Sequence, residues 1–114
     1  MGYTRAGMSL SPPPAAMSAP DLFICLLTVE LVIPWAQSLK DKRSAVHGLK
    51  ERLRVRFNAS VAEVGHQDKW QRAVIAICML GGDRHRLDAE IGRVRQLCAE
   101  ARDIQIAAMR QEWL

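Results

Sequence analysis

The segment "FICLLTVELVI", residues 23–33, decides the fold, because every odd position in it carries a large apolar side chain or cysteine. The even positions include Thr28 and Glu30. Side chains of a β-strand point alternately to its two faces, so the pattern predicts a strand with one fully buried face. Pro34 closes the segment, which is too short for a membrane span and lacks the flanks of a signal peptide. We therefore expect a cytoplasmic protein that does not enter a membrane.

The size of the chain limits it to one folded unit. With 114 residues, 49% of them hydrophobic and 25% charged, it has the composition of a single globular domain. Residues 1–20 include Ser-Pro-Pro-Pro-Ala-Ala and few large apolar side chains, which predicts a disordered tail before a domain over residues 21–114. Met17 is an alternative start, and the sequence leaves open whether residues 1–16 belong to the native protein.

A helix is predicted after the first strand, over residues 39–57. Ser38 followed by Asp41 resembles a capping box. Apolar residues then recur at steps of three and four, at Val46, Leu49, Leu53 and Phe57. The alternation of arginines at positions 52, 54 and 56 favours a strand instead. We prefer the helix because the apolar period extends back to Val46.

Two further strands, residues 58–64 and 70–80, form a predicted hairpin around residues 65–69. Asp83 can cap a second helix, and a closing strand follows around residues 104–108. The apolar positions of these last two elements are Leu87, Ile91, Val94, Cys98, Ile104, Ile106 and Ala108. The order predicts an α+β, ferredoxin-like split βαβ sandwich: a four-stranded antiparallel sheet with two helices on one face.

The other face of that sheet is predicted to be open. Strand alternation assigns to it Ile24, Leu26, Thr28, Glu30, Val32, Val61, Glu63, Trp70, Arg72, Val74, Ala76 and Cys78. Such a face is too apolar to be wholly solvated, so it predicts a homodimer or a protein partner.

Two stretches, "SLKDKRSAVHGLKERLRVRFNASVAEV" (residues 38–64) and "HQDKWQRAVIAI" (residues 66–77), resemble the YlxP-like family of small bacterial proteins of unknown function. The resemblance runs over about residues 23–109 and excludes the proline-rich tail. It implies a ferredoxin-like fold, and genes that in many bacteria lie among those for transcription elongation, translation initiation and ribosome maturation. The matching positions are Ser38, Leu39, Lys40, Lys42, Arg43, Arg52, Arg56, Phe57, Asn58, Glu63, Gln67, Asp68, Trp70, Gln71 and Arg72.

Basic residues are concentrated in the first predicted helix: Lys40, Lys42, Arg43, Lys50, Arg52, Arg54 and Arg56. Against Asp41 and Glu51 they give a local charge of +5 in a chain whose net charge is +4. This asymmetry is typical of a surface that binds ribosomal or other structured RNA. Cations in the first turn of a helix oppose its dipole, and an anionic partner would remove that penalty. An ordinary solvated helix face is the alternative.

The hairpin carries a polar cluster, Glu63, Gln67, Asp68, Trp70 and Arg72. We expect it to be structural: Gln67 and Asp68 bond the turn backbone, and Glu63 pairs with Arg72 across the strands. Trp70 is expected to cover the hairpin or fill an interface. The alternative, a stacking platform for a base, has less support because the predicted strands lack the set of aromatics typical of RNA-recognition domains.

No catalytic or metal motif stands out. Cys25, Cys78 and Cys98 are widely spaced and read as buried free thiols, and the three histidines lack metal-ligand spacing. The pair His66 and Asp68 has no nucleophile placed beside it, and the Gly-Gly-Asp sequence at residues 81–83 lacks the rest of a phosphate loop. We therefore expect no enzyme, cofactor or metal. Two functions stay open: an RNA- or ribosome-binding accessory protein, and a self-associating module.

Overall fold

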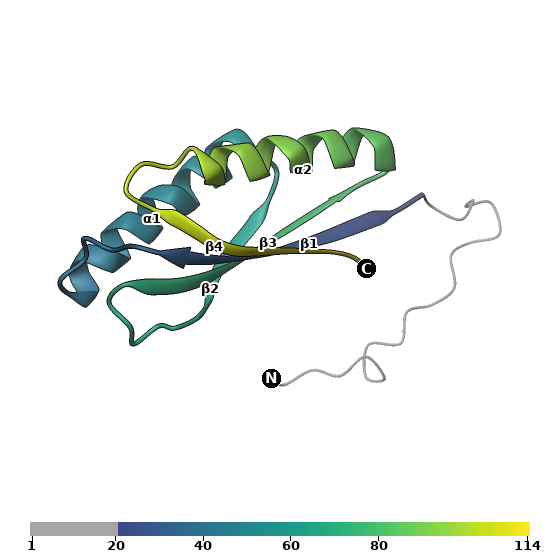
Figure 1. Ribbon diagram of the computed structural model, residues 1–114. Coiled ribbons are helices and arrows are strands. Elements are labelled where there is room, and N and C mark those ends of the chain that lie inside the picture. The colour runs from purple at the N-terminus through teal and green to yellow at the C-terminus, as the bar shows by residue number, and fades with distance from the viewer. Residues whose placement is uncertain (1–20) are drawn as a thin grey trace, which may run out of the picture.

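A computed structural model of the protein describes residues 21–114, so the predicted tail lies outside the described residues. The elements are β1 (Phe23–Val32), α1 (Leu39–Arg56), β2 (Ser60–Gly65), β3 (Arg72–Gly81), α2 (Arg84–Ala99) and β4 (Gln105–Trp113). The strands form one antiparallel sheet in the order β2-β3-β1-β4, and both helices cover the same face of it (Figure 1). The predicted ferredoxin-like fold is confirmed.

Strand β1 lies at the centre of the sheet, between β3 and β4. Its odd positions point into the core: Cys25, Leu27, Val29 and Leu31 are each at most 2% exposed. Its even positions are half-buried on the opposite face. The alternation read from the sequence therefore describes β1 correctly, and the helices seal its odd-numbered side.

Helix α1 begins at Ser38, whose Oγ accepts a hydrogen bond of 3.0 Å from the amide of Asp41. The Asp41 carboxylate in turn accepts one of 3.0 Å from the amide of Gln37, the residue before the cap, so Asp41 bonds back to the chain one residue earlier than in a standard capping box. Val46, Leu49 and Leu53 are buried against the sheet. The three arginines at alternate positions near the end of α1 are helical, because the apolar period decides the conformation there.

Helix α2 begins at Asp83, as predicted, with its carboxylate accepting from the amide of Arg86 at 3.0 Å. That bond lowers the pKa of Asp83. Leu87, Ile91 and Val94 of α2 are buried in the same core. Within residues 21–114, no helix is both long and apolar enough to cross a bilayer.

The face assigned to β2 from the sequence is wrong. Val61 lies opposite Ile77 and Glu63 opposite Ile75, and both isoleucines point into the core. Directly paired residues share a face of the sheet, so Val61 and Glu63 face the helices. A break in the register between Glu63 and Gly65 then shifts the rest of the strand.

The open face otherwise contains the predicted residues. Ile24 lies opposite Leu80, and Leu26 lies opposite Cys78. None of the four side chains is in the core: Leu80 is exposed and the other three are half-buried. Trp70 is an exception, because β3 begins at Arg72 and Trp70 belongs to the preceding turn.

Leu53 and Val55 of α1 provide a matched test of this packing. Leu53 is 0% exposed and Val55 is 83% exposed. We expect Leu53→Ala to lower the free energy of unfolding by about 3 kcal/mol, because it leaves a cavity under the helix. Val55→Ala should change it by no more than about 0.5 kcal/mol. Urea unfolding followed by circular dichroism measures both, and equal losses would contradict the packing described.

Candidate nucleic-acid interface

Lys42, one of the seven predicted binding residues, is completely buried. Its Nζ donates to Glu63 Oε2 at 3.2 Å, to the carbonyl of His66 at 2.7 Å and to that of Gln67 at 3.2 Å. Lys42 lies four residues before Val46, on the apolar side of α1, so it points at the sheet rather than at solvent. The prediction that Lys42 contacts a partner is wrong, and its role is to fasten α1 to the β2–β3 hairpin.

Three members of the hairpin cluster, Glu63, Gln67 and Arg72, form hydrogen bonds within the domain, and the partners of Glu63 and Arg72 differ from those predicted. Glu63 pairs with Lys42 at 3.2 Å, whereas Arg72 lies on the open face and bonds Glu30. The predicted ion pair between Glu63 and Arg72 is therefore wrong, because the two side chains occupy opposite faces of the sheet. The amide of Lys69 closes the turn on the carbonyl of His66 at 3.0 Å. The Asp68 side chain forms no hydrogen bond with the described residues, so the prediction that it bonds the turn backbone is wrong.

Gln67 contributes to the turn through both its backbone and its side chain. Its carbonyl accepts from Lys42, and its Nε2 donates to the carbonyl of Glu63 at 3.4 Å. The expectation that Gln67 bonds the turn backbone is confirmed.

The other basic residues divide between two sides of α1. Four predicted residues recur with His47 at steps of three and four, which places them in one line along the helix. We call this line the α1 stripe: Lys40, Arg43, His47, Lys50 and Arg54. All are exposed except Lys50, which is half-buried. The prediction from the sequence included only lysines and arginines and so omitted His47, although a spacing of four from Arg43 indicates the same side of the helix.

Arg54 fixes the position of the α1 stripe over the outer edge of β2. One guanidinium nitrogen of Arg54 donates to the carbonyl of Val61 at 2.8 Å, and another bonds Glu51 at 2.9 Å. The bond from Arg54 lowers the pKa of Glu51. Arg52 and Arg56 instead lie on the opposite side of α1, where Arg56 lines a hollow shared with Glu90 of α2.

Three loops meet at the start of α1, and Figure 1 shows them together at one end of the domain. We call residues 33–38, 66–71 and 100–104 the loop end. Nε2 of Gln71 donates to the carbonyls of Pro34 and Ala36, each at 3.0 Å, and Nε1 of Trp35 donates to the carbonyl of Asp103 at 2.9 Å. These side-chain bonds join residues 33–38 to each of the other two loops.

Two tryptophans lie exposed at the loop end. Trp35 is 44% exposed and Trp70 is 54% exposed. The expectation that Trp70 covers the hairpin is therefore wrong, and the alternative that it fills an interface stays a prediction. Trp70 lies in the turn, two residues before β3 begins, and its side chain does not pack in the core.

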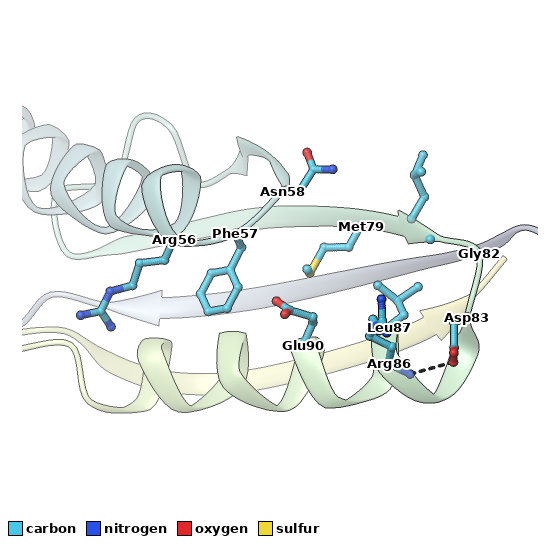
Figure 2. Close-up of a pocket in the computed structure, with 11 residues that line it drawn as sticks. Arg56, Phe57, Asn58, Met79, Gly82, Asp83, Arg86, Leu87 and Glu90 are labelled. Carbon is cyan, nitrogen blue, oxygen red and sulfur yellow. Dashed lines mark hydrogen bonds between the residues drawn. The ribbon is translucent and has the colours of Figure 1, made fainter.

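A separate hollow of about 540 Å³ lies between the end of α1, the end of β3 and the start of α2. Figure 2 shows the ring of Phe57 and the side chain of Met79 between α2 and the sheet. Its carboxylates already have partners within α2: Asp83 caps the helix, and Glu90 pairs with Arg93 at 2.7 Å. The hollow thus has a mixed lining, in which apolar side chains such as Phe57 and Met79 lie beside charged residues that stabilise α2.

The three cysteines differ in their burial. Burial raises the pKa of Cys98 to about 11 and also raises that of Cys25, so both are unreactive thiols at neutral pH. Cys78 differs from the prediction, since it is only half-buried, on the open face. In the part of the chain that the structure describes, no three His, Cys, Asp or Glu side chains are grouped to hold a metal ion.

Comparison with known proteins assigns this α+β domain to a family. Residues 24–111 match the family described as protein of unknown function (DUF503), and the chain is a member of that family. It is similar to the uncharacterized protein YlxP of Bacillus subtilis (strain 168), with 33% identity over 84 residues, 74% of this chain and 91% of that protein. The predicted membership of a YlxP-like family is confirmed.

Replacing Lys42 tests the buried bond network. We expect Lys42→Met to lower the free energy of unfolding by about 3 kcal/mol, because Glu63 and two carbonyls lose their donor inside the protein. Lys40→Met, two residues away and exposed, is the matched control and should change it by no more than about 0.5 kcal/mol. Urea unfolding measures both, and a Lys42→Met protein as stable as the control would contradict this role.

Proposed function

We propose that this protein is a non-enzymatic accessory protein that binds ribosomal or other structured RNA through the α1 stripe. The observation that carries the proposal is the alignment of Lys40, Arg43, Lys50 and Arg54 with His47 on one side of α1. Successive members are separated by three or four residues, a rise of about 5 Å along a helix. A row of cations at that spacing can follow a phosphate backbone.

The charges of the α1 stripe are largely unneutralised. Arg54 is its one member with a carboxylate partner within residues 21–114, and that partner is the exposed Glu51. Lys40, Arg43 and Lys50 form no ion pair with the described residues. Like charges along one side of a helix repel one another, so an anionic partner would lower the free energy of this surface.

Two further considerations support this function. The carboxylates of the hollow, Asp83 and Glu90, already bond groups of α2, which favours a structural role for them over a catalytic one. The gene neighbourhood that the family resemblance implies, among translation and ribosome-maturation genes, fits an RNA-binding role in the cytoplasm.

The two basic sides of α1 allow a matched test of RNA binding. We expect Lys40→Gln/Arg43→Gln to weaken binding to a structured RNA about tenfold and to reduce its salt slope by about 2. Arg52→Gln/Arg56→Gln removes the same charge from the other side of the helix and should have little effect. Fluorescence anisotropy at several salt concentrations measures both. Equal losses in the two proteins would show that net charge, and not the α1 stripe, governs binding.

A second candidate function is self-association through the open sheet face. Ile24, Leu26 and Val74 are half-buried there, and Leu80 is 59% exposed. Apolar side chains side by side on an uncovered sheet are typical of a surface that pairs with another protein. A second copy of this chain could supply the same apolar surface around a two-fold axis.

Leu26→Lys tests the second candidate, because it places a charge at the middle of the open face. We expect the unmodified protein to be dimeric by analytical ultracentrifugation and Leu26→Lys to be monomeric. Val55→Lys adds the same charge to an exposed position on α1 and should remain dimeric. A monomer for the unmodified protein at high concentration would exclude self-association through this face.

A further inference from the structure

The loop end presents two indole rings to solvent in a protein with few aromatic residues. The chain has only three Trp, one Tyr and two Phe, and two of the three Trp are exposed at the same end. A tryptophan ring contributes most to stability when it is buried, so these two contribute little to the core. Burial in the core therefore does not explain the position of either ring.

Hydrogen bonds hold the loops that carry both rings. Gln71, next to Trp70, bonds the carbonyls of Pro34 and Ala36, the two neighbours of Trp35. Trp35 is also anchored by its own bond to Asp103, and the amide of Ile33 donates to the carbonyl of Gln71 at 2.9 Å. The two tryptophans are thus exposed on loops whose backbones are fixed to each other. Rings on fixed loops lose little freedom when they bind a partner.

The same end contains two non-glycine residues with left-handed backbone, His66 with φ 56° and Asp103 with φ 64°. This conformation is uncommon outside glycine, and it persists where surrounding contacts hold it. Lys42 bonds the carbonyl of His66, and Trp35 bonds the carbonyl of Asp103. Both unusual conformations are thus secured by side chains of the loop end or of the helix start beside it.

The loops that carry the two rings lie at the end of the domain where α1, and with it the α1 stripe, begins. Trp35 precedes Lys40 by five residues, and Lys69 lies directly before Trp70. Exposed aromatic rings beside cations form the usual surface for unpaired bases: the cations contact phosphates and the rings stack on bases. We infer that Trp35 and Trp70 stack on unpaired bases of an RNA whose phosphates bind the α1 stripe.

This inference rests on the proposed function and narrows its substrate class. The ligand would be an RNA in which an unpaired loop or bulge adjoins a paired stem. The stem phosphates would lie along α1, and the unpaired bases would reach the loop end. A partner protein that inserts an apolar side chain between the two rings is the competing occupant, and the experiment separates it from RNA.

Tryptophan fluorescence provides a direct test, because Trp113 lies opposite Cys25 at the far end of β1 and serves as the control. The Trp113→Phe protein retains Trp35 and Trp70 as reporters, and the Trp35→Phe/Trp70→Phe protein retains Trp113. The probes are an RNA hairpin with a loop of unpaired adenines and a fully paired duplex of the same stem. We expect the RNA hairpin to quench the tryptophan fluorescence of the Trp113→Phe protein. It should leave the fluorescence of the Trp35→Phe/Trp70→Phe protein unchanged.

Binding affinity gives the second readout. We expect the unmodified protein to bind the hairpin about tenfold more tightly than the duplex, since each stacked base adds binding free energy. Trp70→Ala breaks no hydrogen bond of the described residues, and it should remove most of this preference while duplex binding remains. Trp35→Ala should do the same where circular dichroism shows that it is folded.

The outcomes distinguish this inference from the proposed function. One outcome is salt-dependent binding of the duplex, equal affinity for the RNA hairpin and no quenching of tryptophan fluorescence. This outcome would overturn the stacking site but would leave the proposed binding of phosphates by the α1 stripe standing. Absence of binding to either RNA would overturn both, and would favour a protein partner at the loop end. Quenching of Trp113 together with the other two would also overturn the inference, because it would report a change far from the rings.

Discussion

The buried ammonium of Lys42 is the interaction on which the arrangement of the candidate interface depends. A charged amine removed from water is strongly unfavourable unless its hydrogens all find acceptors. Here Glu63 and the carbonyls of His66 and Gln67 supply three. These acceptors belong to β2 and to the hairpin turn, whereas Lys42 belongs to the first turn of α1. One side chain therefore sets the distance between the helix layer and the hairpin at the end where the loops converge.

Once α1 is fastened in that orientation, its period of 3.6 residues determines the position of every other basic side chain. Lys42, Val46, Leu49 and Leu53 form the buried side. The α1 stripe follows on the side over β2, and Arg52 with Arg56 on the side toward α2. The basic residues that look like one cluster in the sequence are thus divided by the helix into three groups. Lys42 is buried, the α1 stripe forms an aligned surface, and Arg52 and Arg56 lie on the side of the hollow. The aligned surface has the longest run of regularly spaced cations on the helix, and under the proposed function this run would contact the phosphate backbone.

The fold could be predicted from the sequence because its determinants are local. Alternation in β1, the apolar period of α1 and the caps at Ser38 and Asp83 each act within a few residues, and all are present in the structure. The site could not be predicted to the same extent, because it depends on which residues meet across the sheet. The register of β2 against β3 turns Glu63 toward the helices, and no local signal in the hairpin sets that register. The burial of Lys42 could be predicted in part, since Lys42 precedes Val46 by four residues. A buried lysine also needs hydrogen-bond acceptors, and these come into place only through the register of β2 against β3.

The two candidate surfaces occupy different sides of the molecule, and this separation has a consequence for function. The helices cover one face of the sheet, so a dimer formed through the open faces would leave both copies of α1 on the outside (Figure 1). Each α1 stripe and each loop end would then remain free to bind RNA. Two moderate sites joined in one assembly bind a long RNA more tightly than either alone, because the second contact becomes intramolecular. Self-association and RNA binding are therefore compatible in this fold, and the first would strengthen the second without adding any contact to the α1 stripe.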